Sequence, residues 1–127
     1  MILISLLSTQ RGLLSFDELV AEAVDYVFGS IFGERLAFII WTCLEVRFAV
    51  GRLDVARRPN MFSKSLEKMF GPTAARNLEG RILKRLCQML KIEMELKKGL
   101  EFSDYIGELR KAYMKILAVK YMPLISR

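Results

Sequence analysis

The chain has 127 residues, of which 53% are hydrophobic and 27% charged, and it carries a net charge of +6. This length and composition favour one folded domain with its own core over a disordered chain. The sequence contains no histidine, which excludes His-based catalytic triads and His-containing metal sites. We therefore expect a single domain, residues 1–127, that is not an enzyme, has no catalytic residues and binds neither a cofactor nor a metal.

The charge is unevenly distributed along the chain. Residues 1–51 carry three basic and six acidic side chains, whereas residues 52–98 carry twelve basic and five acidic ones. A basic surface beside an acidic one can bind a polyanion or the acidic surface of a second copy.

Three sequence features bear on the cellular environment of the protein: its cysteines, its few side-chain amides and its apolar runs. Cys43 and Cys87 exclude a four-cysteine zinc site and favour two buried free thiols, with a disulfide as the alternative. Only two asparagines and two glutamines occur, which indicates a thermophilic source. No run of 18 uncharged residues exists, and no Lys or Arg precedes the apolar segment Met1–Leu7. We therefore expect a cytoplasmic protein without a membrane partner.

Apolar residues recur at helical spacing and nowhere alternate as in a strand, which predicts an all-α fold, a compact bundle of about five helices. The first predicted helix, 15–29, opens with a capping box formed by Ser15 and Glu18 and ends at Gly29. Its apolar stripe consists of Phe16, Leu19, Val20, Ala23, Val24, Val27 and Phe28.

The second predicted helix, 33–50, is apolar on nearly every side and ends before Gly51. One side consists of Leu36, Ile39, Ile40, Cys43, Leu44 and Phe48, and most of the rest of Phe38, Trp41 and Val46. Such a helix lies at the centre of a bundle or in an oligomer interface. Together with the unpartnered segment Met1–Leu7 it predicts a two-fold homodimer. The alternative is a monomer with a frayed N-terminus.

Proline and glycine mark the later helices. A loop over 52–58 leads to the third helix, 59–70, because proline suits the first helical turn. Gly71-Pro72 then ends one helix and begins the next, predicted over 72–98 with Gly99 as its C-terminal cap. The fifth helix is predicted over 103–121.

Residues 59–86 contain a distinctive pattern: Pro-x-x-Phe, a helix ending in Phe-Gly, and then Leu-Glu before another apolar helix. It is carried by Pro59, Phe62, Leu66, Phe70, Gly71, Leu78 and Glu79, with a further Leu-Glu pair at 44–45. Over about residues 33–90 the chain resembles NitrOD, the Nitrosopumilus output domain, a family of small archaeal helical domains. The resemblance implies a compact module, alone or attached to signalling proteins, with an output role of unknown chemistry. We therefore expect an archaeal signalling or regulatory module that binds an unidentified protein partner through helix surfaces.

A basic face on the fourth predicted helix offers an alternative function. At about 100° per residue, Arg81, Lys84, Arg85 and Lys91 share one face, and two further arginines precede the third helix. The candidate nucleic-acid or anion-binding residues are Arg57, Arg58, Arg81, Lys84, Arg85 and Lys91. They favour a DNA-binding transcriptional regulator whose long helix contacts phosphates. The other interpretation is a solvated charged face.

Two carboxylates, Glu45 and Glu79, lie within otherwise apolar helices. Facing each other, they could act as an acid and a base with shifted pKa values. The other interpretation is that each forms a structural ion pair with a nearby arginine.

Overall fold

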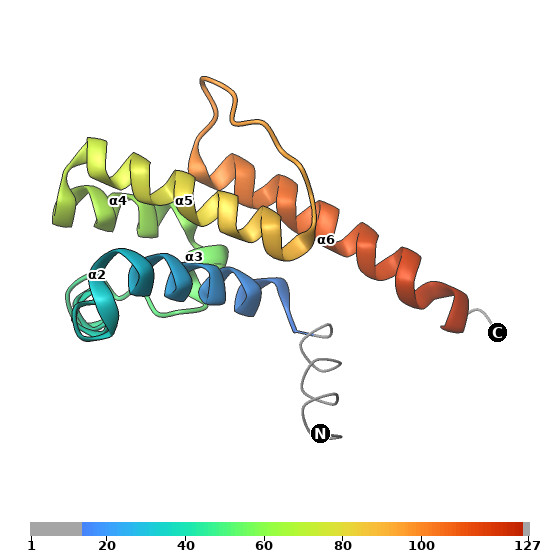
Figure 1. Cartoon of the computed structure of the whole chain (residues 1–127), viewed down its shortest axis with the longest axis horizontal. Helices are drawn as coiled ribbons and strands as arrows, with labels where there is room; N and C mark the ends of the chain where they lie inside the picture. Colours follow the sequence, from blue (N-terminus) through green and yellow to red (C-terminus); the bar gives the residue numbers. More distant parts are fainter. Residues whose placement is uncertain (1–13, 126–127) are drawn as a thin grey trace.

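The computed structural model describes residues 14–125, and all regular structure among them is helical (Figure 1). The helices are α2 (Phe16–Phe48), α3 (Asp54–Arg57), α4 (Pro59–Phe70), α5 (Pro72–Leu90) and α6 (Phe102–Ile125). They pack around a shared core as one bundle, which confirms the expected all-α, single-domain fold. The segment Met1–Leu7 lies outside the described residues.

Helix α2 replaces the first two predicted helices and is broken at Gly33 (φ 81°, ψ 165°). The prediction that Gly29 ends a helix is wrong, because this residue keeps helical geometry. A glycine inside a helix costs only about 1 kcal/mol. Packing on both sides of it outweighs that cost, since Phe28 is fully buried and Phe32 stacks on Phe70 of α4 at 5.7 Å between ring centroids.

Local capping interactions fix both ends of α2. Ser15 accepts a hydrogen bond from the Glu18 backbone N–H at 3.2 Å, as the capping box predicts. The helix ends at Phe48, where Ala49 adopts a left-handed conformation (φ 56°) and the Val50 N–H bonds to the Leu44 carbonyl. The predicted end at Val50 is therefore two residues late.

Helices α3 and α4 follow in quick succession. The predicted loop over 52–58 contains a single helical turn, α3, whose Val55 and Ala56 are buried. Helix α4 begins at Pro59 and ends before Gly71 (φ 87°), with the predicted bounds. Helices α4 and α5 then lie side by side, joined at Gly71 (Figure 1).

The prediction that the fourth helix continues to Lys98 is wrong, because α5 ends at Leu90. Lys91 is left-handed (φ 56°), and the Ile92 N–H bonds back to the Cys87 carbonyl at 2.9 Å. The following chain forms an irregular segment, residues 92–101, that is anchored from a distance. The Tyr105 hydroxyl of α6 donates to the Lys97 carbonyl at 2.7 Å and accepts from the Lys97 N–H.

Helix α6 begins one residue before its predicted start and runs four residues past its predicted end. Asp104 caps it by accepting the Glu101 N–H at 2.8 Å. Gly99 (φ 88°) lies in the turn before α6, and not at the end of α5 as predicted. The C-terminal part of α6 projects beyond the other helices (Figure 1).

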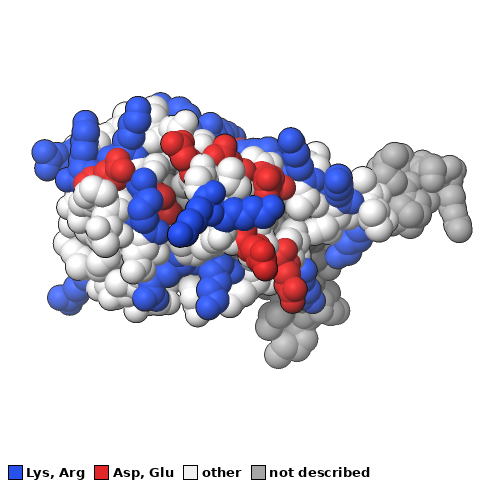
Figure 2. All heavy atoms as spheres, turned by 90° about the horizontal axis from the view of Figure 1, so that it is seen from above, with Lys and Arg blue, Asp and Glu red and all other residues white. Residues whose placement is uncertain are grey.

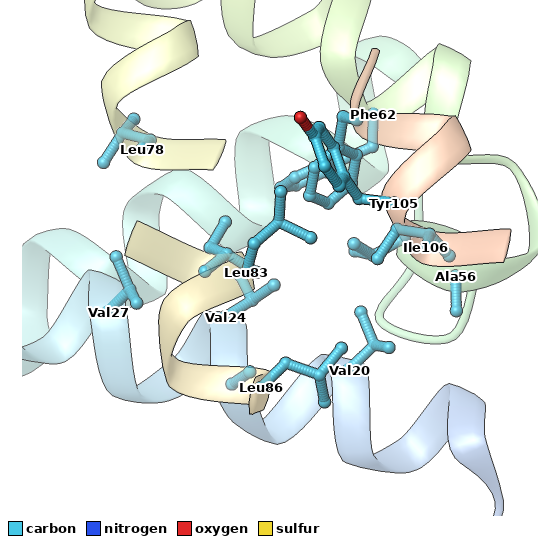
Figure 3. Close-up of a cluster of buried hydrophobic side chains, with 14 of the residues drawn as sticks. Val20, Val24, Val27, Ala56, Phe62, Leu78, Leu83, Leu86, Tyr105 and Ile106 are labelled. Atoms are coloured by element: carbon cyan, nitrogen blue, oxygen red, sulfur yellow. The ribbon is translucent and has the colours of Figure 1, made fainter. Parts of the chain in front are cut away.

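The core lies between the first segment of α2 and helices α4, α5 and α6 (Figure 3). All seven residues of the predicted first stripe are buried, because they form one continuous face. Val20 and Val24 of α2 face Leu86 of α5, and Phe62 of α4 packs against Phe102 of α6 at 5.7 Å. The second segment of α2 contributes much less, since only its Ile40 and Leu44 are buried.

Candidate functional site

An apolar helix face is left uncovered on the second segment of α2, residues 34–48. Phe38, Ile39 and Val46 are 71%, 58% and 77% exposed, and Arg35 and Thr42 are exposed between them. We call these five residues the outer α2 face. The expectation that this helix is buried on most sides within the bundle is wrong, because the bundle covers only the opposite side.

Trp41 fixes the direction of the outer α2 face. Its indole N–H donates to Asp25 in the first segment at 2.9 Å, and its ring lies 5.6 Å from that of Phe28. Arg52 stacks on the same indole at 5.4 Å and pairs with Asp25. These contacts hold the second segment against the first, so the outer α2 face is a preformed surface. Sequence periodicity did not reveal this link, because its partners lie far apart in the chain.

The four basic residues predicted on α5 have different surroundings. The Arg85 guanidinium lies 3.8 Å from the centre of the Tyr26 ring and is partly buried. Arg81 donates to the neutral Asn77 side chain at 3.0 Å. Lys84 and Lys91 are exposed. Arg81 and Lys84 therefore remain as exposed cations on α5, with Lys91 directly after its end. Figure 2 shows acidic side chains interspersed among basic ones on the face that it views.

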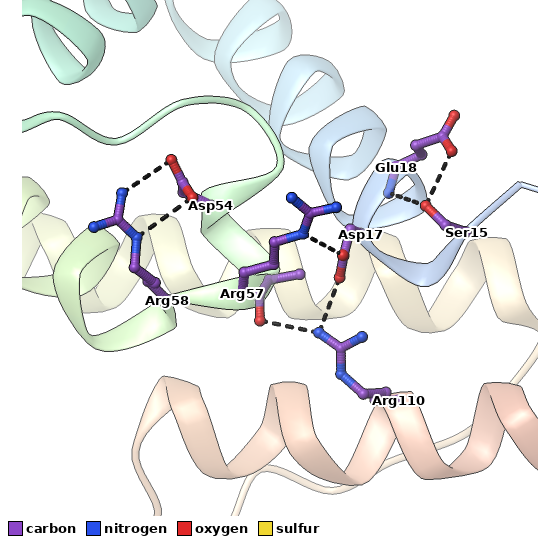
Figure 4. A network of polar contacts seen from close by, with 8 residues as sticks. Ser15, Asp17, Glu18, Asp54, Arg57, Arg58 and Arg110 are labelled. Atoms are coloured by element: carbon purple, nitrogen blue, oxygen red, sulfur yellow. Dashed lines mark hydrogen bonds and ion pairs between the residues drawn. The ribbon is translucent and has the colours of Figure 1, made fainter.

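Arg57 and Arg58 both form ion pairs around α3 (Figure 4). Arg57 Nε bonds to Asp17 at 2.8 Å, and Asp17 also binds Arg110 of α6 at 2.9 Å. Arg58 pairs with Asp54 at 3.1 Å and donates to the Ala49 carbonyl at 2.7 Å. Both arginines thus have acidic partners in the folded chain, and their role as phosphate ligands stays a prediction.

The ion pairs around α3 lower the pKa values of their carboxylates. Burial raises the pKa of Asp17, but hydrogen bonds and charges from Arg57 and Arg110 outweigh it and hold the pKa below the ordinary value of 3.8. The Arg58 hydrogen bond, followed by the Gly51 N–H, lowers the pKa of Asp54. The cluster joins α2, α3 and α6, so it is a structural junction.

The two candidate acid–base carboxylates are in different environments. Glu45 is exposed near the end of α2. Glu79 is 4% exposed and accepts hydrogen bonds from the Ser63 hydroxyl and from Arg76, whose Nε lies 3.0 Å away. Burial raises the pKa of Glu79, and the Ser63 and Arg76 contacts only partly offset this. Glu79 therefore forms the structural ion pair that the sequence left as the second interpretation.

A pocket of about 370 Å³ adjoins the Glu79 pair, between α4, α5 and the irregular segment. Both oxygens of Glu79 already have partners, and Arg76 also binds Glu67 at 3.2 Å. No group of three or more Cys, Asp or Glu side chains in the described chain could hold a metal ion. The pocket is therefore a surface cleft beside a satisfied ion pair.

Both cysteines are free thiols, and both are partly buried. Cys43 lies on α2 and Cys87 on α5, where burial raises the pKa of the Cys87 thiol. A raised pKa leaves less of the reactive thiolate at neutral pH.

Among the described helices, α2 alone is long and apolar enough to cross a membrane by length and composition, and 22% of that window is buried. The break at Gly33 leaves segments 16–32 and 34–48, each shorter than the ~20 residues needed to span. A bilayer would also leave backbone groups at the break without partners. The apolar character of the second segment is thus a property of an exposed face on a bundle helix.

No family model matches the sequence, and comparisons with curated proteins and with solved structures found no match either.

We predict that Asp17→Asn lowers the free energy of unfolding by about 1–3 kcal/mol at pH 7, because two arginines lose their charged partner. The folded pKa of Asp17 lies below its ordinary value, so its contribution is complete above 3.8 and is lost as the pH falls through the folded pKa. Urea unfolding of both proteins from neutral to acidic pH tests this. The difference should shrink below 3.8, and Glu108→Gln, an exposed control, should show none. A difference independent of pH would contradict the assignment.

Proposed function

We propose that this chain is a non-enzymatic binding module that recognises a partner protein through helix surfaces, and that the outer α2 face is its main binding surface. The exposure of Phe38, Ile39 and Val46 carries the proposal. Large apolar side chains exposed on one helix face are typical of interaction sites. The face is also held rigidly by Trp41, so little conformational freedom is lost on binding.

The chemistry around the face suits recognition. Phe38 supplies a large aromatic side chain of the kind that anchors interfaces. Arg35 lies within the outer α2 face, and Glu34, Glu45 and Arg47 lie at its edges. Apolar side chains combined with charges provide burial together with selection of the partner.

A regulatory role in the cytoplasm follows as part of the same proposal. Residues 33–90 resemble the archaeal NitrOD modules, to which an output role is assigned. The second segment of α2 belongs to this stretch, so the proposed surface lies within the part of the chain that carries the resemblance. Glu79, whose pKa is raised by burial, is paired with Arg76, which supports a module without bond chemistry.

Site-specific crosslinking tests the proposed surface. We predict that a photoreactive phenylalanine analogue replacing Val46 forms covalent adducts, either with the chain itself in pure solution or with a host protein in extract. The same group at Lys111, an exposed position on α6, is the control and should form far fewer. Equal yields at the two positions, or no adduct at position 46 in either setting, would contradict the proposal.

Binding of DNA through α5 is the second candidate. It is supported by Arg81, Lys84 and Lys91, which are exposed and form no ion pair with another described residue. Cations on one helix face can neutralise successive phosphates, and the affinity then falls steeply with salt. The loss of Arg57 and Arg58 to ion pairs makes this surface smaller than the sequence predicts.

This second candidate predicts that duplex DNA shifts in a gel at about 50 mM salt and much less at about 200 mM. The double variant Arg81→Ala, Lys84→Ala should weaken binding by about tenfold or more. Lys111→Ala with Lys115→Ala removes the same charge from α6 and should have a smaller effect. Absence of a shift at the lower salt concentration would eliminate DNA binding.

A further inference from the structure

The geometry points to a second copy of this chain as the partner of the outer α2 face, packed antiparallel about a two-fold axis. This inference rests on the proposed function, because it names the occupant of the same surface.

The spacing of the outer α2 face suits helix pairing. Arg35, Ile39, Thr42 and Val46 follow one another at intervals of four, three and four residues. This alternation keeps the four residues on one line along the helix, as in a coiled-coil seam, and two of them, Ile39 and Val46, are apolar. A two-fold contact requires a surface complementary to itself. In an antiparallel pair centred between Ile39 and Thr42, those two residues lie opposite each other, and Arg35 lies at the level of Val46.

Charge decides between the two directions of packing. A parallel pair would bring Arg35 against Arg35 at one end of the seam, where like charges repel. An antiparallel pair places Arg35 next to Glu45 of the second copy, and symmetry creates this contact twice. Both side chains are exposed, and neither forms an ion pair with a described residue of its own chain. The antiparallel arrangement therefore gives Arg35 an acidic partner and brings a second cation to Glu45, whose charge already acts on Arg52 of its own chain.

The same charges argue against a lipid surface as the occupant. Arg35 lies between apolar residues of the face, and Glu34 and Glu45 lie at its edge. Membrane-bound helices keep their apolar side free of charge and place cations on the polar side. A protein surface can pair these groups, whereas hydrocarbon cannot.

The size of the outer α2 face sets the expected affinity of the dimer. A helical segment of residues 34–48 is about 22 Å long. One helix of this length buries less than the roughly 800 Å² per partner of a standard interface. We therefore expect a dimer that dissociates at micromolar concentration, in which single charge changes have visible effects.

Sedimentation equilibrium of the purified full chain over micromolar concentrations tests the inference. The wild type should dimerise, and Arg35→Glu alone or Glu45→Arg alone should raise the dissociation constant about tenfold or more. The double variant should recover most of the affinity, because it exchanges the two charges. Lys111→Glu makes the same charge change as Arg35→Glu on α6 and should leave the dimer unchanged. Circular dichroism and thermal unfolding show whether each variant is folded.

Three results would overturn the inference. The first is a wild type that is monomeric throughout. The second is a dimer unaffected by folded Arg35→Glu and Glu45→Arg variants. The third is binding of the wild type to phosphatidylcholine–phosphatidylglycerol vesicles that Val46→Asp abolishes, which would assign the face to lipid. A monomer whose position 46 still crosslinks to a host protein rejects the second copy but keeps the proposed function. A monomer without such adducts rejects both.

Discussion

The backbone at Gly33 determines which side of α2 reaches the core and which side stays in solvent. Its torsion angles, φ 81° and ψ 165°, lie in a region that residues with a side chain rarely adopt. The chain therefore changes direction there, and residues 34–48 fold back far enough for Trp41 to reach Asp25. Without this break, α2 would continue as one straight rod and present a different face. The outer α2 face is a direct consequence of this one glycine.

Much of the fold was predictable because it depends on constraints that are local in the chain. Pro59 and Gly71-Pro72 restrict their own backbone angles, so the bounds of α4 and the start of α5 follow directly. Ser15 and Glu18 lie one helical turn apart and cap the first helix without help from elsewhere. The stripe between them and Phe28 has helical spacing, and its burial was predicted correctly.

The features that could not be predicted depend on contacts between distant parts of the chain. Gly29 and Gly33 are equivalent as local signals, and only packing of the surrounding aromatic rings selects Gly33 as the break. The irregular segment after α5 is held by Tyr105, which bonds to Lys97 from another helix. Arg57 was predicted to be available for phosphate, but its partner lies 40 residues earlier. The spacing of apolar residues predicts an apolar helix face. It does not show whether other helices of the bundle cover that face.

A pair of alanine substitutions four residues apart tests the role of Gly33 most directly. Gly29→Ala introduces a methyl group into open space within a helix and should raise the midpoint of thermal unfolding. Gly33→Ala also meets no steric obstacle, but its positive φ strains any side chain, so it should lower the free energy of unfolding by about 1–3 kcal/mol. Thermal and urea unfolding of the two variants beside the wild type give the answer. We predict that Gly29→Ala stabilises the protein and that Gly33→Ala destabilises it. Equal stabilisation by both substitutions would show that α2 does not need its break.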